Sequence, residues 1–329
     1  MPERNIETPY ARLILFKRMP LAVFWGAVAI TAFIGGEILF RTFHEPGAIC
    51  TQLVFAFFLI YGPVVHAWLL RRFEAVVRQV GPLLWDDQAE SEAWLQARLK
   101  RCFTFSSWPA ISVTGIIVAL GVVSVLVQGK CFNSTVLYVA AVSGFMPVLL
   151  ICAHAGYVTL DLLATLKELG QRKPNVPFFM LPHPAITALQ AFYSGLALSV
   201  TLGYAALAVA LWRSPFGLSP TMQAWLLILS FYPISTFGWS FYQTHVLMRE
   251  AKLQHLVLIN AEVQRCLSRT LNGGDIQSIE RLQKIMEVQR KSQATREWPF
   301  DIQNSFALLI ALAAATAQIL SSAIEFAKR

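Results

Sequence analysis

The stretch SWPAISVTGIIVALGVVSVLVQ, residues 107–128, decides the fold class because it contains no ionisable side chain. A helix needs about 20 consecutive apolar residues to cross the hydrocarbon core of a bilayer. Similar runs recur along the 329 residues, of which 56% are hydrophobic and only 14% charged. A soluble globular domain carries about 25% charged residues. The sequence therefore predicts an all-α, polytopic membrane protein.

Apolar runs of sufficient length predict seven transmembrane helices. The first run is too long for a cleavable signal peptide, and no small-residue cleavage site precedes the next charged sequence. The predicted spans are residues 20–40, 50–70, 107–128, 135–163, 185–212, 221–247 and 303–324.

Lys and Arg are divided unevenly between alternate loops. Of the 27 such residues, 22 lie in the N-terminal segment and in the loops after the second, fourth and sixth spans. Loops rich in Lys and Arg stay in the cytosol. The distribution predicts a cytosolic N-terminus and an external C-terminus, in a plasma membrane or bacterial inner membrane. The net charge of +8 is thereby explained as a topology signal, which argues against a nucleic-acid partner.

These assignments divide the chain into three parts. Residues 1–247 form a six-helix transmembrane region that includes a cytosolic helical segment, 71–106. That segment breaks near Gly81-Pro82 and continues as a helix whose charge changes from acidic to basic, as the helix dipole favours. Residues 248–297 form a cytosolic helical hairpin. Residues 298–329 form an interfacial turn and the final transmembrane helix.

The hairpin is predicted from two amphipathic stretches on either side of a glycine pair. Gly273 and Gly274 suit a helix end, and Asp275 suits the N-cap of the next helix. Asn260 and Gln289 interrupt the two apolar stripes. A weakly apolar seam with such polar residues can specify register or oligomeric state. The stripes are therefore expected to pack within the chain or on another subunit.

The last predicted span has one face of small and polar side chains. Small residues allow close packing of helices in a membrane, and the same face can line a pore when several subunits assemble. Both interpretations stay open. The pore hypothesis assigns the lining to Ala311, Ala314, Gln318, Ser322 and Glu325.

Four residues, Trp298-Pro299-Phe300-Asp301, join the hairpin to this span. Trp298 and Phe300 suit the headgroup level of a bilayer. Pro299 ends the preceding helix, because it lacks an N–H and disfavours a helical Trp298. Asp301 suits the N-cap of the final helix. The four residues are predicted to couple the hairpin to the last span.

Three histidines and one aspartate fall at similar depth in the predicted spans and form a candidate metal site. Such a set can bind zinc in a membrane-embedded enzyme. The common enzyme motifs are absent, so no catalytic residue and no cofactor are assigned. The candidate ligands are His66, His154, Asp161 and His245.

Cys50 and Cys131 lie at the ends of the first two external loops. A disulfide between them is possible in an oxidising compartment. Two small residues near helix ends account for the pattern equally well.

Seven spans, a cytosolic N-terminus and a long cytosolic helical segment before a short last span resemble the insect odorant and gustatory receptor superfamily of ion channels. The resemblance covers the whole chain as topology. The superfamily's closing T-Y and Q-F motif is absent, so no site residue is transferred. The resemblance implies a ligand-responsive channel, homo-oligomeric through residues 248–297 and the last helix. The alternative is a non-conducting sensor, scaffold or defence-type effector that signals through the hairpin.

Overall fold

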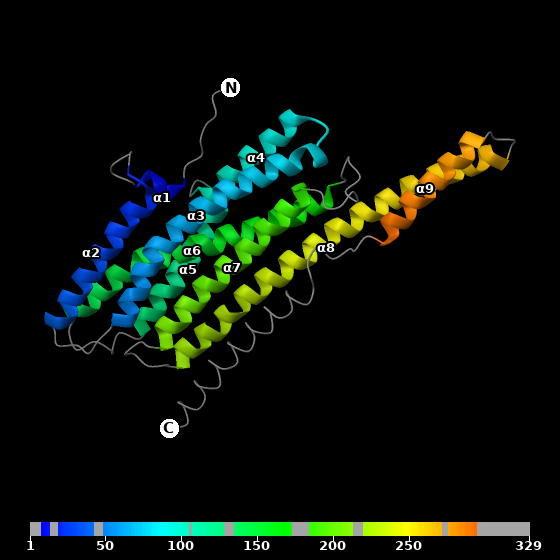
Figure 1. Cartoon of the computed structure of the whole chain (residues 1–329). Helices are drawn as coiled ribbons and strands as arrows, with labels where there is room; N and C mark the ends of the chain where they lie inside the picture. Colours follow the sequence, from blue (N-terminus) through cyan, green and yellow to red (C-terminus); the bar gives the residue numbers. More distant parts are fainter. Residues whose placement is uncertain are drawn as a thin grey trace.

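The computed structural model describes residues 8–13, 19–42, 49–104, 107–127, 135–172, 184–212, 220–271 and 276–294. Every regular element in these ranges is an α-helix, which confirms the all-α prediction for them (Figure 1). The helices are α1 (Pro9–Arg12), α2 (Leu21–Thr42), α3 (Ile49–Leu84), α4 (Gln88–Phe103), α5 (Trp108–Val127), α6 (Thr135–Gln171), α7 (Pro184–Trp212), α8 (Pro220–Leu271) and α9 (Ile276–Ala294).

Five helical segments of the described chain are long and apolar enough to cross a membrane, which indicates an integral membrane protein. The predicted count of seven is not established. The sixth predicted span, 221–247, lies within α8 and is not among the five, and the seventh, 303–324, lies outside the described residues. The five segments are Leu21–Leu39, Gln52–Leu84, Gln88–Val123, Phe145–Gln171 and Ala188–Ala208.

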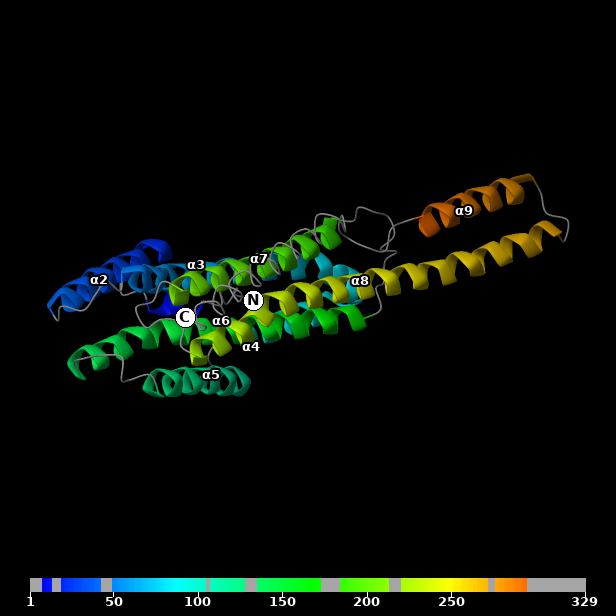
Figure 2. The same cartoon turned by 90° about the horizontal axis from the view of Figure 1, so that it is seen from below.

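The centre of the helical bundle is formed by α3 and α6. Helix α3 packs against α2, α6 and α7, and α6 packs against α3, α5 and α8. In α6, 67% of the apolar stretch is buried, against 11% in α2. Helices α2 and α5 lie on opposite sides of the bundle (Figure 2). The peripheral helices therefore present most of their apolar surface outward, as lipid-facing helices do.

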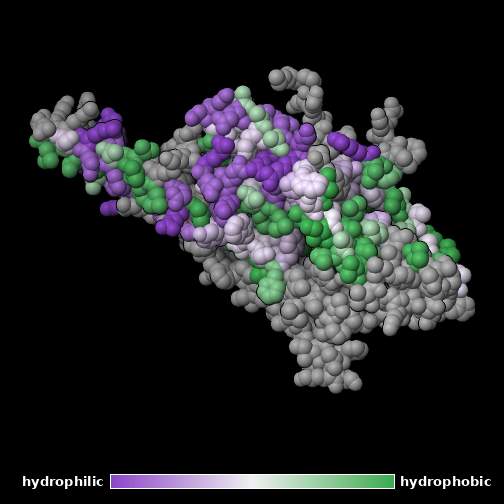
Figure 3. All heavy atoms as spheres, turned by 180° about the vertical axis from the view of Figure 1, so that it is seen from behind, coloured by the Kyte–Doolittle hydropathy of each residue, from purple (hydrophilic) through white to green (hydrophobic). Residues whose placement is uncertain are grey.

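The larger hydrophobic core lies where α3, α4, α6 and α7 meet. The charged helix α4 covers this core, so the apolar side chains beneath it are enclosed on all sides by helices. Hydrophilic residues gather over this end of the molecule and hydrophobic residues over the other (Figure 3). The fully buried side chains of this larger core include Phe73, Leu95, Phe103, Leu162 and Tyr193.

The junction between α3 and α4 differs from the predicted break. Helix α3 continues past Gly81-Pro82 to Leu84. Gly81 allows a close approach of the two helices, because a Cβ there would meet the Ser91 hydroxyl of α4 and that side chain would have to turn away. The Asp87 side chain caps α4 by accepting a 2.9 Å hydrogen bond from the Ala89 N–H. With basic residues in its last turn, α4 confirms the predicted change from acidic to basic.

A second close approach, between α7 and α3, generates a stability prediction. A Cβ on Gly195 would lie 2.6 Å from Cη2 of the Trp68 indole, a rigid ring. We expect Gly195→Ala to lower the stability by about 1–3 kcal/mol, the usual cost of overpacking a core. Thermal unfolding in detergent measures the loss.

Gly170→Ala is the matched control, because open space surrounds Gly170 near the end of α6. It should not destabilise the protein. Trp68→Phe shortens the ring and should recover most of the loss in the Gly195→Ala background. Additive effects of the two substitutions would contradict the proposed contact.

Candidate functional site

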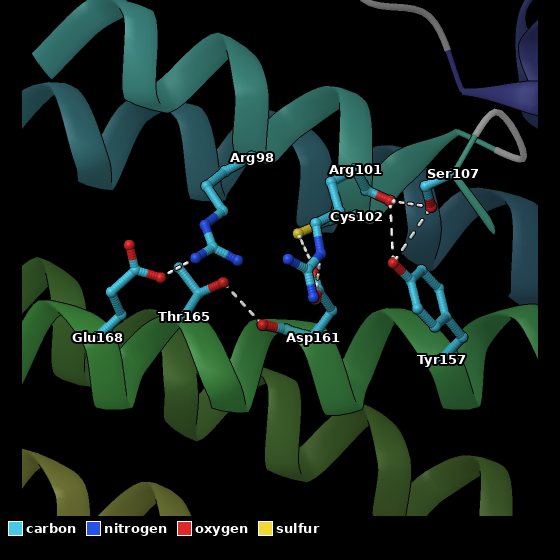
Figure 4. Close-up of polar contacts among 8 residues, drawn as sticks. All are labelled: Arg98, Arg101, Cys102, Ser107, Tyr157, Asp161, Thr165 and Glu168. Atoms are coloured by element: carbon cyan, nitrogen blue, oxygen red, sulfur yellow. Dashed lines mark hydrogen bonds and ion pairs between the residues drawn. The ribbon is translucent and has the colours of Figure 1, made fainter. Parts of the chain in front are cut away.

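A group of polar contacts fastens α4 to α6, and its centre is Asp161 (Figure 4). Only 4% of the Asp161 side chain is exposed. Arg101 Nε lies 3.0 Å from Asp161 Oδ1, and the Cys102 thiol donates a 2.7 Å hydrogen bond to Oδ2. A buried carboxylate is tolerated only when a charge and hydrogen bonds compensate its lost hydration. Helix α4 supplies both.

Glu168 forms a second contact, two turns along α6. Its carboxylate forms an ion pair with Arg98 and accepts a 2.9 Å hydrogen bond from Trp94 Nε1. Arg172 then stacks 4.3 Å from the centre of the Trp85 ring, at the end of α3. We call the Asp161 and Glu168 contacts the α4–α6 latch. The latch binds α4 to the bundle from Trp94 to Cys102, the C-terminal part of this helix.

The C-terminus of α4 is held by hydroxyl groups. Tyr157 and Ser107 both donate to the backbone oxygen of Arg101, at 3.2 Å and 3.3 Å. Carbonyl groups in the last turn of a helix have no partner within the helix. These two bonds satisfy one of them and fix the path from α4 to α5.

A separate cluster joins the N-terminal helix α1 to the bundle. The rings of His66 and His154 lie 4.7 Å apart, centre to centre. The Tyr10 hydroxyl lies 3.1 Å from His154 Nδ1, and its ring lies 5.2 Å from that of His66. Trp25 Nε1 donates to the Tyr10 carbonyl at 3.3 Å. We call Tyr10, His66 and His154 the Tyr–His cluster.

Polar atoms in this cluster lie away from solvent. His66 is 2% exposed, and its Nε2 has no hydrogen-bond partner among the described residues. Burial raises the pKa of the Tyr10 hydroxyl, so it stays protonated at neutral pH and is able to donate. A buried polar atom without a partner is costly, so the packing around His66 must compensate for it.

Only part of the predicted metal site is assembled. His66 and His154 lie together, but Asp161 is engaged by Arg101 and Cys102, and His245 lies on α8, where it is half-buried. No three His, Cys, Asp or Glu residues form a metal-binding group within the described ranges. The four residues are therefore not brought together as a zinc site.

The C-terminal part of α8 lies beside α9, and the two helices are antiparallel (Figures 1 and 2). Gln289 Nε2 donates a 2.8 Å hydrogen bond to Asn260 Oδ1. Arg281 Nη2 lies 3.0 Å from Glu262 Oε1. The two residues that interrupt the apolar stripes in the sequence are thus bonded to each other across the seam.

Several predicted residues lie outside the described ranges. The possible disulfide stays a prediction, because Cys131 is outside them and the side chain of Cys50 is not described. The turn and the pore-lining set are outside as well: Trp298, Pro299, Phe300, Asp301, Ala311, Ala314, Gln318, Ser322 and Glu325.

Comparison of the chain with known protein families, with curated proteins and with solved structures gave no match. The resemblance to the odorant and gustatory receptors therefore rests on topology alone.

The α4–α6 latch generates a prediction for Asp161→Asn. This substitution removes the charge that pairs with Arg101 and accepts from the Cys102 thiol. Because Arg101 is 48% exposed and water can solvate it, we expect a loss of about 1–3 kcal/mol. Thermal unfolding in detergent should show this decrease in stability. Glu74→Gln is the control, because the Glu74–Arg78 pair is solvent-exposed and such pairs contribute about 0–1 kcal/mol. Equal effects would contradict a central role for Asp161.

The Tyr–His cluster generates a prediction for Tyr10→Phe, which removes the hydroxyl bonded to His154. We expect faster hydrogen exchange in residues 8–13 and a stability loss of about 0.5–1.5 kcal/mol. Tyr61→Phe is the control, because it removes a 2.8 Å bond to the Ser199 carbonyl elsewhere in the bundle. If it accelerates exchange in residues 8–13 equally, Tyr10 does not hold α1 specifically.

Proposed function

We propose that this chain is the subunit of a homo-oligomeric, ligand-responsive membrane channel whose last helix, 303–324, lies nearest the pore axis. The observation that carries the proposal is the continuity of α8. Its 52 residues correspond to about 78 Å of helix, whereas the hydrocarbon core is about 30 Å thick. One continuous helix, interrupted by no break although it contains Pro233, therefore leads from the bundle to the α8–α9 pair that precedes the last helix.

The proposed orientation places the N-terminus, the α4 layer and the α8–α9 pair in the cytosol and the C-terminus outside. The excess of Lys and Arg in one set of loops supports it. In this arrangement residues 1–247 anchor the subunit, 248–297 assemble it, and 298–329 carry the pore helix. Trp298-Pro299-Phe300-Asp301 is the covalent link through which a cytosolic movement reaches that helix.

A second candidate is a non-conducting sensor or scaffold, including a defence-type effector, that signals through the α8–α9 pair. The dense core beneath α4 favours it, because that core builds a substantial water-facing layer around the helix ends. A membrane-embedded metal enzyme has less support, since only two of its four proposed ligands lie together.

Bilayer recordings with the purified chain test the channel. We expect currents, and we expect Glu325→Gln or Gln318→Leu to change the unitary conductance, because polar rings in a narrow pore determine the local ion concentration. Glu37→Gln is the control, since Glu37 lies on the peripheral helix α2, 3.4 Å from Arg41. A folded multimer without currents would favour the second candidate.

A further inference from the structure

The central helices α3 and α6 change from apolar to charged at one level of the bundle. The first Asp, Glu, Lys or Arg of α3 is Arg71, and that of α6 is Asp161. His66 and His154 lie five and seven residues before these positions, and their rings lie 4.7 Å apart. The two apolar stretches therefore end side by side.

An exposed tryptophan marks the same level. Trp108 is the first residue of α5 and is 78% exposed. The preceding Ser107 places its Oγ 3.4 Å from the hydroxyl of Tyr157, one turn before Asp161 on α6. Tryptophan side chains favour the headgroup level of a bilayer. We call this level of the bundle the boundary level.

Helix α4 brings a lysine to the boundary level. It runs back along α3 (Figure 1), and the Phe103 ring lies 5.3 Å from that of His66 and 6.3 Å from that of Phe73. Phe103 is therefore level with the part of α3 between these two residues. Lys100, three residues earlier in an antiparallel helix, lies level with the residues just before Phe73.

Arg71 and Lys100 lie on the same outer face of the α3–α4 hairpin. Arg78 lies two turns after Arg71 on the same side of α3, and its Nη2 lies 3.5 Å from Oε1 of Glu92 on α4. Lys100 lies eight residues after Glu92, about 80° around that helix. Both side chains are exposed. We call Arg71 and Lys100 the boundary pair.

The boundary pair has no acidic partner among the described residues. Glu74 lies one turn from Arg71, but its carboxylate lies 3.0 Å from Arg78 instead. Four other arginines of the α4 layer are each paired with a carboxylate: Arg78 with Glu74 and Glu92, Arg98 with Glu168, Arg101 with Asp161, and Arg172 with Glu90. Two neighbouring positive charges at the boundary level thus lack the anion that the other arginines have.

An exposed apolar stripe leads from the boundary pair into the membrane. Val64, Phe57 and Leu53 are 37%, 37% and 52% exposed. At about 100° per residue they lie within about 40° of Arg71 on the surface of α3. From Arg71 to Phe57 the stripe is about 21 Å long at 1.5 Å per residue. One leaflet of the hydrocarbon core is about 15 Å deep, half of about 30 Å, so the stripe covers the depth of an acyl chain.

We propose that Arg71 and Lys100 bind the phosphate of an anionic phospholipid whose acyl chain lies along this stripe of α3. A guanidinium binds phosphate through paired hydrogen bonds, and an ammonium adds a compact charge. Basic residues at the surface of an anionic leaflet are attracted to its headgroups. The apolar stripe selects a lipid over a free phosphate ion, because only the lipid covers it.

Lipid binding by the full chain in detergent tests the site. Native mass spectrometry counts the molecules of phosphatidylglycerol that the protein retains, with phosphatidylcholine as the neutral comparison. We expect the double variant Arg71→Gln, Lys100→Gln to lose affinity for phosphatidylglycerol at least about tenfold, since each basic residue contributes to attraction by an anionic headgroup. Phosphatidylcholine should bind weakly to the native chain and to the variant.

The matched control is the double variant Lys284→Gln, Arg290→Gln. It also removes one lysine and one arginine, and both residues are exposed on α9, beyond the bundle. Its net charge therefore equals that of the test variant, and its affinity for phosphatidylglycerol should equal that of the native chain.

Thermal unfolding supplies a second measurement. Phosphatidylglycerol should raise the midpoint of the native chain and of the control, and it should raise that of the Arg71→Gln, Lys100→Gln variant much less. Without added lipid the three proteins should unfold at the same temperature, which verifies the fold. Inorganic phosphate at the same concentration should not raise the midpoint.

Each contrary result has a distinct meaning. Unchanged affinity in the Arg71→Gln, Lys100→Gln variant overturns the site. An equal loss in the α9 control shows attraction by net charge alone and also overturns it. Phosphatidylcholine bound as tightly as phosphatidylglycerol overturns an anionic headgroup, and equal protection by inorganic phosphate overturns a lipid ligand. None of these measurements involves a current, so their failure leaves the proposed channel standing.

Discussion

The buried carboxylate of Asp161 is the constraint on which the packing of α4 against α6 depends. An ionised carboxylate among apolar side chains is tolerated only if a partner reaches it, and Arg101 and Cys102 reach it from α4. Their position decides where α4 lies and therefore which side chains it covers. The core beneath α4, with Phe73, Phe103 and Leu162, is closed by this helix.

Two kinds of packing thus meet in the same long helices. Where α3 and α6 pass beside α2 and α5, most of the apolar surface of α2 and α5 faces outward. Individual contacts, such as the hydrogen bond from Trp25 to the Tyr10 carbonyl, join the elements there. Farther along, the same helices bury aliphatic and aromatic side chains almost completely. The first pattern suits a lipid solvent and the second suits water.

The sequence predicted those features that depend on local pattern. Apolar runs indicated the helices and the membrane class, and the spacing around Gly273-Gly274 indicated the seam in which Asn260 meets Gln289. It did not indicate that Tyr10 contacts His154, because these residues are separated by 144 positions and no periodicity links them. The sequence also suggested Asp161 as a metal ligand, because it lies at the same predicted depth as the three histidines. Its partner Arg101 belongs to another helix, and the sequence does not show that the two residues meet. Depth alone therefore did not distinguish a metal ligand from a salt-bridge partner.

The continuity of α8 also has a mechanical consequence. A helix of 52 residues behaves as a lever whose inner arm is held between α6 and α7 and whose outer arm is free of the bundle. The outer arm runs for about 35 Å from Met248, which is buried in the core, to Leu271 at 1.5 Å per residue. A tilt of this arm by about 5° displaces its tip by about 3 Å. A small rotation where the helix leaves the bundle is thereby amplified into a movement of several ångströms at the far end of α8.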